Sequence, residues 1–304
     1  MSGLNREPAD AVHWTSLLLE QGWCVIPSVL PHYTIAALDA ELARDFEETP
    51  FCSGGFYGAR TKRFGRLLAR SPLAANLVGH PLVLAIVRAV LGPFCDCIQL
   101  NLTQALALHP GAPPQLPHRD QDMWRGAIGE TEYLVNVMWP FTPYRYENGA
   151  TIIWPFSHGL NALRSDPPAE HFAAELGPGS ALLFLGSTLH GAGGNRSPDV
   201  RRGAIVSYCL GWLKPYENQW LAYPPDVARN FTPDLAALVG YTQHRPNLGN
   251  YEGQCPSILL RDDVPERFAA QDALRPDQEE LVAEFVRTQV WPESTAFEVR
   301  SAFR

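Results

Sequence analysis

The sequence predicts a mainly β fold with flanking α-helices, built on a double-stranded β-helix (a jelly-roll, cupin-like core). Between residues 96 and 212, short apolar segments alternate with Gly, Pro and Asn, which is typical of a β-sandwich or barrel. Helical spacing of apolar residues occurs before and after this region. The 304 residues are 46% hydrophobic and 18% charged, as in globular proteins.

The N-terminal part, about residues 10–92, is predicted to be a helical support. Its helices begin with proline or end at glycine, as Gly22 and Gly92 show, and both residues mark helix boundaries well. The expected elements are a helix over 10–21, a strand over 23–26, and helices over 31–48 and 81–91.

The jelly-roll core is predicted over about residues 96–215, followed by a C-terminal extension over about 216–304. Because there is no internal repeat and no low-complexity linker, we expect a single domain over 1–304. The extension contains a short amphipathic helix over 277–286 that could cover the core, the active-site mouth or a second subunit, so a homodimer stays open. The strands expected in the core cover 97–108, 133–139, 150–154, 180–185 and 203–212.

Charge and composition narrow the classes of function. A net charge of −8 disfavours a nucleic-acid-binding protein, although five basic residues lie between positions 60 and 70. Apolar runs are too short to span a membrane, and the N-terminus lacks the apolar core of a signal peptide. The six cysteines form no CxxC pair, so we expect reduced thiols and a cytoplasmic protein.

The most informative motif is His118-Arg119-Asp120. In extended backbone the side chains of His118 and Asp120 point to the same face. One imidazole and one carboxylate make up two-thirds of the 2-His-1-carboxylate triad that holds non-haem Fe(II) with open coordination positions. The neighbouring Asp122 is interpreted as a helix cap or surface group, since a further carboxylate would fill an open position.

Two downstream segments provide what this motif lacks. The apolar run 180–185 leads to His190, which stands before a glycine-rich turn and is the predicted third ligand; His158 is the rival. Eleven residues later a strand-like segment begins with Arg201 and Arg202. An arginine entering a buried strand needs an anion, and its fork matches the distal carboxylate of 2-oxoglutarate.

With these motifs, the chain resembles the phytanoyl-CoA dioxygenase-like family of Fe(II)/2-oxoglutarate-dependent oxygenases, including its secondary-metabolism branch. The resemblance extends from about Gly22 to about Pro256. It implies Fe(II), 2-oxoglutarate and dioxygen as cofactor and cosubstrates, and Arg201 as the cosubstrate arginine, with Arg202 as the fallback. The turn Trp154-Pro155-Phe156-Ser157 departs from the family's usual Pro-Gly-Ser-His, which leaves its shape open.

The resemblance also implies further site residues. Gln115 and Thr151 occupy positions where relatives contact 2-oxoglutarate, and Arg63 lies in a stretch that some relatives use in the same way. Met123 and Trp124, which follow the metal pair directly, are either core residues or the wall of the substrate site.

The sequence predicts an oxidoreductase that hydroxylates, desaturates or otherwise oxidises a largely apolar small molecule of secondary metabolism. Because Asp120 is present where related halogenases carry a small residue, halogenation is not expected. The alternatives are a phytanoyl-CoA-like acyl-CoA hydroxylase, which would need a basic phosphate site such as residues 60–70, a zinc-dependent hydrolase, and a non-catalytic jelly-roll binding protein.

Overall fold

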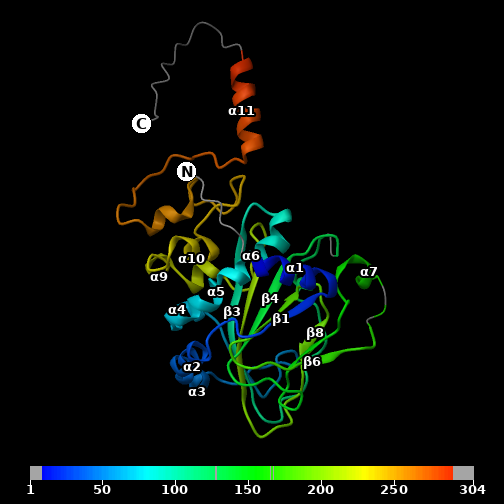
Figure 1. Cartoon of the computed structure of the whole chain (residues 1–304). Coiled ribbons are helices and arrows are strands. Elements are labelled where there is room, and N and C mark those ends of the chain that lie inside the picture. Colours follow the sequence, from blue (N-terminus) through cyan, green and yellow to red (C-terminus); the bar gives the residue numbers. More distant parts are fainter. Residues whose placement is uncertain (1–8, 127–128, 165, 167, 290–304) are drawn as a thin grey trace.

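The computed structural model describes residues 9–126, 129–164, 166 and 168–289. Two antiparallel sheets form its centre, with helices around them (Figure 1). The larger sheet has the strand order β1-β7-β4-β9-β3-β2, and the smaller has the order β6-β5-β8. The strands are β1 Trp23–Ile26, β2 Thr61–Phe64, β3 Ile98–Leu108, β4 Leu134–Pro140, β5 Thr151–Ile153, β6 Phe172–Ala174, β7 Ala181–Leu185, β8 His190–Ala192 and β9 Arg201–Leu210.

Strand alternation divides the larger sheet into two buried faces. On β4, Val135 and Val137 belong to the core on the helical side, whereas Met138 belongs to a second core that also contains residues of the smaller sheet. Because both faces are covered, β4 is buried along its whole length. The face turned toward the smaller sheet is the one that carries the polar groups described below.

The helices lie outside the two sheets. Helix α6 contacts α1, β4 and β9, so these two helices cover the outer face of the larger sheet (Figure 1). The helices are α1 Ala9–Gln21, α2 His32–Glu41, α3 Ala43–Glu48, α4 Leu67–Arg70, α5 Ala75–Val78, α6 Pro81–Leu91, α7 Gly159–Leu163, α8 Gln219–Ala222, α9 Pro225–Ala228, α10 Pro233–Leu238 and α11 Pro276–Thr288.

The mainly β fold with flanking helices is confirmed, and the differences from the predicted elements are local. The helix expected over 31–48 is divided at Leu42, whose φ of −87° and ψ of 0° end α2. Strand β9 begins at Arg201 rather than at residue 203. Three strands were not predicted: β2, β6 and β8, which contain three or four residues each.

The C-terminal extension contributes short helices beside the sheet and then α11, which stands away from the sheets in Figure 1. No residue of α11 is buried. Within the described ranges, no single helix is long and apolar enough to cross a bilayer; Pro72–Val78 and Pro81–Phe94 pass that test only as a pair bent by 45°. All six cysteines are unpaired.

Candidate active site

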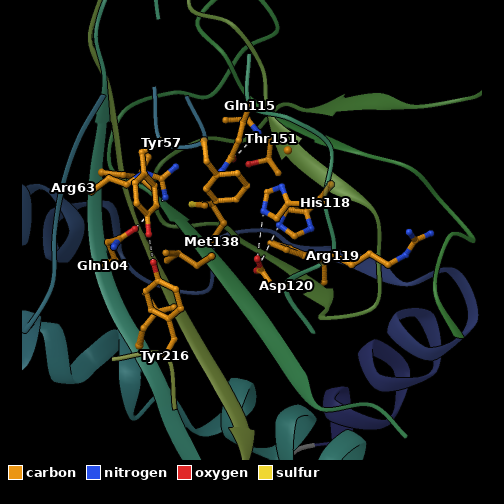
Figure 2. A pocket seen from close by; sticks show the side chains of 18 of the residues that line it. Tyr57, Arg63, Gln104, Gln115, His118, Arg119, Asp120, Met138, Thr151 and Tyr216 are labelled. Atoms are coloured by element: carbon orange, nitrogen blue, oxygen red, sulfur yellow. Dashed lines mark hydrogen bonds and ion pairs between the residues drawn. The ribbon is translucent and has the colours of Figure 1, made fainter. Parts of the chain in front are cut away.

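The backbone brings the two predicted histidine ligands side by side. His118 and His190 exchange two backbone hydrogen bonds of 2.9 and 3.0 Å, so their rings lie 4.4 Å apart, centroid to centroid. The carboxylate of Asp120 faces both rings, with Oδ1 at 3.3 Å from Nε2 of His118 and Oδ2 at 3.5 Å from Nε2 of His190 (Figure 2). The three residues converge on one point from two separate parts of the chain.

Both imidazoles are oriented for metal binding. Nδ1 of His118 lies 2.8 Å from the carbonyl oxygen of Leu116, and Nδ1 of His190 lies 3.0 Å from that of Thr188. A ring that donates through Nδ1 keeps the lone pair of Nε2 for a metal. The ligand atoms all lie within 4.8 Å of one another, and no other group of three such residues occurs in the described part of the chain.

The charges of the cluster suit a divalent cation. Burial lowers the pKa of His190, which favours the neutral imidazole that a metal requires. Burial by itself raises the pKa of Asp120, but His190, His118 and a hydrogen bond from Asn136 hold it below its ordinary value. Burial also lowers the pKa of His118, but the hydrogen bond and charge of Asp120 raise it above its ordinary value. The site therefore presents an ionised carboxylate to both rings.

Three residues around the triad, which the sequence left in doubt or did not assign, have defined places in the structure. His158, the rival ligand, directs Nε2 to the carbonyl oxygen of Leu19, 2.9 Å away at the end of α1. Phe156, which stands where the family usually has glycine, adopts the left-handed conformation with a φ of +57°. Arg119 directs its guanidinium away from the triad in Figure 2 and donates to the carbonyl oxygens of Ser187 and Ser157.

Arg201 is the buried cation of the site. Its side chain is 1% exposed, and its guanidinium lies 4.2 Å from the ring centroid of Tyr144. Nε and Nη1 have no hydrogen-bond acceptor. Arg202, one residue further along β9, points to the other face and pairs with Asp39 at 2.6 Å. Of these two neighbouring arginines, Arg201 is thus the one that lacks an anion.

A cavity of about 390 Å³ joins the triad to Arg201. Of the predicted residues, Gln115, Thr151 and Arg63 line it, and Met123 lies at its edge, 44% exposed. Trp124 is not part of the lining; its Nε1 donates to the carbonyl oxygen of Lys214, and its ring packs against the edge of Tyr133.

Several lining residues were not predicted from the sequence. Nη1 of Arg63 donates a 3.0 Å hydrogen bond to Oε1 of Gln104. The guanidinium of Arg63 also lies over the ring of Tyr57. The hydroxyl of Tyr57 contacts that of Tyr216 across the cavity (Figure 2). Gln104 alternates along β3 with Leu102 and Leu106, which line the same cavity. Asp122, which was interpreted from the sequence as a helix cap or surface group, also lines the cavity. The other residues missed are Phe56, Leu102, Leu106, Arg119, Met138, Phe184, Gly191, Ala192 and Ile205.

Comparison with known proteins identifies the family. The family model described as phytanoyl-CoA dioxygenase (PhyH) matches residues 18–203. "Dioxygenase cdmD" of Talaromyces verruculosus is 32% identical over 60% of this chain and 62% of its own length. "Dioxygenase trt7" of Aspergillus terreus is 30% identical over 74% of this chain and 82% of its own length. "Multifunctional dioxygenase ausE" of Aspergillus calidoustus is 28% identical over 78% and 86%.

Solved structures share the fold at low sequence identity. The epimerase SnoN, in a complex with Fe3+, alpha ketoglutarate and nogalamycin RO, has a TM-score of 0.56 at 18% identity, over 67% of this chain and 85% of SnoN. HygX from Streptomyces hygroscopicus, with nickel and 2-oxoglutarate, has a TM-score of 0.53 at 16% identity, over 71% and 91%. This similarity confirms the jelly-roll prediction. The chain belongs to the phytanoyl-CoA dioxygenase (PhyH) family and is a non-haem Fe(II)/2-oxoglutarate-dependent dioxygenase, with a facial-triad-like group of His118, Asp120 and His190.

Proposed function

We propose that this enzyme oxidises a C–H bond of a largely apolar small molecule of secondary metabolism, by hydroxylation, desaturation or a related oxidation. The observation that carries the proposal is one cavity with three different parts. A metal-binding triad lies on one side, a buried guanidinium without an anion lies on another, and apolar side chains form much of the remaining wall.

Arg201 is the proposed partner of the distal carboxylate of 2-oxoglutarate. A buried guanidinium without a counterion is costly, and a planar carboxylate can satisfy two of its N–H groups at once. Nε and Nη1 of Arg201 are buried without an acceptor, and the side chain lines the cavity, so a carboxylate bound there can pair with the guanidinium. Thr151 and Gln115 line the same cavity and add a hydroxyl and an amide, while Arg63 supplies a second cation.

His118, Asp120 and His190 are the proposed iron ligands. They would supply three ligands to Fe(II), and the remaining positions would serve the 2-oxo acid and dioxygen. When bound, Fe(II) with 2-oxoglutarate supplies the oxidising chemistry. The protein's own part is to hold the cosubstrate by its carboxylates, keep water away from the iron and place the carbon to be oxidised.

The lining of the cavity supports an apolar substrate. Apart from the groups assigned to the metal and the cosubstrate, much of the wall is hydrocarbon, thioether or aromatic. SnoN was solved in complex with nogalamycin RO, and HygX with hygromycin B, so both of these proteins bind small molecules. The apolar residues of the wall are Phe56, Leu102, Leu106, Met123, Met138, Phe184 and Ile205.

The placement of the basic residues between positions 60 and 70 disfavours the acyl-CoA alternative. Lys62 donates to the carbonyl oxygens of Phe46 and Glu47, and Arg70 pairs with Asp45. Arg66 donates to the carbonyl oxygen of Ala222. These side chains are directed to separate intramolecular partners, so they do not gather into a site for the phosphates of coenzyme A. Cytoplasmic localisation stays a prediction.

The test is a substrate screen by succinate formation. Purified enzyme with Fe(II), 2-oxoglutarate and dioxygen is incubated with neutral apolar natural products and, separately, with branched and straight acyl-CoA thioesters. We expect stimulated succinate release, and a product heavier by one oxygen or lighter by two hydrogens, with the first group. The His190→Ala variant is the inactive control. Stimulation by acyl-CoA alone would overturn the proposed substrate class.

A further inference from the structure

Asn136 is a polar residue in the middle of the larger sheet. It lies on β4, is 1% exposed, and pairs in register with Phe184 of β7 and Ser207 of β9. Directly paired side chains share a face, so Asn136 projects to the same side as Phe184, which packs against His190. Its neighbours Val135 and Val137 point to the helical side. The amide therefore faces the metal site.

The side-chain nitrogen of Asn136 makes a hydrogen bond, whereas its side-chain oxygen makes none. Nδ2 donates a 2.9 Å hydrogen bond to Oδ2 of Asp120, whereas Oδ1 is buried without a donor. Burying a polar atom without a partner costs free energy, and an apolar residue of the same size would avoid that cost. The stability of β4 therefore does not explain an asparagine at this position, and its benefit lies in the bond to Asp120.

Asp120 has few other partners. Among the described residues, the side chains that contact its carboxylate are His118, His190 and Asn136. In the ligand set proposed above, Nε2 of each histidine is directed to the iron. Asn136 is then the side-chain donor that holds the carboxylate in place.

We propose that Asn136 is a positioning residue that fixes the orientation of the Asp120 carboxylate for iron binding. The proposal rests on the ligand set of the proposed function. Residues that hydrogen-bond to a metal ligand change metal affinity by about 10- to 100-fold when they are removed. The same bond limits rotation of the carboxylate, so iron would be held with Asp120 in one orientation.

The decisive variant is Asn136→Leu, which removes the donor and keeps the branched shape of the side chain. Anaerobic titration of the apoprotein with Fe(II), in the presence of 2-oxoglutarate, follows the visible absorbance of the complex and gives the iron affinity without turnover. We expect affinity to fall about 10- to 100-fold, while the apoprotein stays folded, as thermal unfolding would show. Asn136→Ala, measured in the same way, serves if the leucine variant does not fold.

Asn101→Leu is the matched control. Asn101 is also fully buried in the larger sheet, but it donates to Oγ of Ser207 at 3.0 Å and accepts from the backbone of Tyr216 at 2.7 Å. Its loss should lower stability and leave iron affinity unchanged. An equal loss of iron affinity in both variants, or wild-type affinity in folded Asn136→Leu, overturns the inference. If His190→Ala also keeps iron, the ligand set itself is wrong, so the two failures can be told apart.

Discussion

Replacing Arg201 by methionine tests the assignment of the cosubstrate arginine and has two opposite expected effects. The guanidinium is 1% exposed and has no acceptor at Nε or Nη1. A charge-assisted pair in such a desolvated place is worth about 2–5 kcal/mol, which corresponds to a tens- to thousands-fold weaker affinity for 2-oxoglutarate. Because the variant also removes a buried charge that has no partner, the cosubstrate-free protein should become more stable.

The assay is calorimetric titration of 2-oxoglutarate into the Ni(II)-loaded protein, together with thermal unfolding of the cosubstrate-free form. Arg202→Met is the matched control. Arg202 lies on the other face of β9 and pairs with Asp39 at 2.6 Å, so its loss should lower stability slightly and leave 2-oxoglutarate affinity within a few-fold. The assignment is refuted if Arg201→Met binds 2-oxoglutarate normally, or if Arg202→Met shows the large loss instead.

Three further predictions follow from the site. His190→Ala should abolish iron binding and turnover. His158→Ala should retain both, because Nε2 of His158 is directed to the carbonyl oxygen of Leu19. The reverse result in an iron titration would show that His158, not His190, is the third ligand. Since Asp120 occupies a ligand position, products formed in saturating chloride should show no chlorine isotope pattern by mass spectrometry, and such a pattern would contradict this role. Burial raises the pKa of Glu132 from 4.5 to about 7. Because this carboxyl group binds its proton more tightly in the folded state, Glu132 favours folding most at low pH. We therefore expect its contribution to the free energy of unfolding to fall by up to about 3 kcal/mol as the pH rises from 4.5 to 7. In thermal unfolding across this range, Glu132→Gln should flatten the dependence of stability on pH, and an unchanged dependence would contradict the prediction.

Some strands could be predicted because a boundary residue or their length is evident in the sequence. Residues 23–26 follow Gly22, which has a φ of +86°. A side chain at this position would collide with His158 and Thr188. Strand β3, with eleven residues, is long enough to stand out. Strands β6 and β8 have three residues each and depend on their neighbours for pairing, so local sequence does not define them.

The sequence by itself determined the chemistry that can be read within a few residues: a histidine and a carboxylate on one face of an extended segment, a further histidine before a glycine-rich turn, and two arginines at the start of a strand. Tertiary structure decided which candidates meet. The pairing of His118 with His190 and the register of β9 placed Arg201 in the cavity and Arg202 on Asp39. It also placed Trp124 outside the cavity and Asn136 against Asp120. The physical reason is that hydrogen bonds between distant strands fix which side chains share a face, and no local pattern carries that pairing.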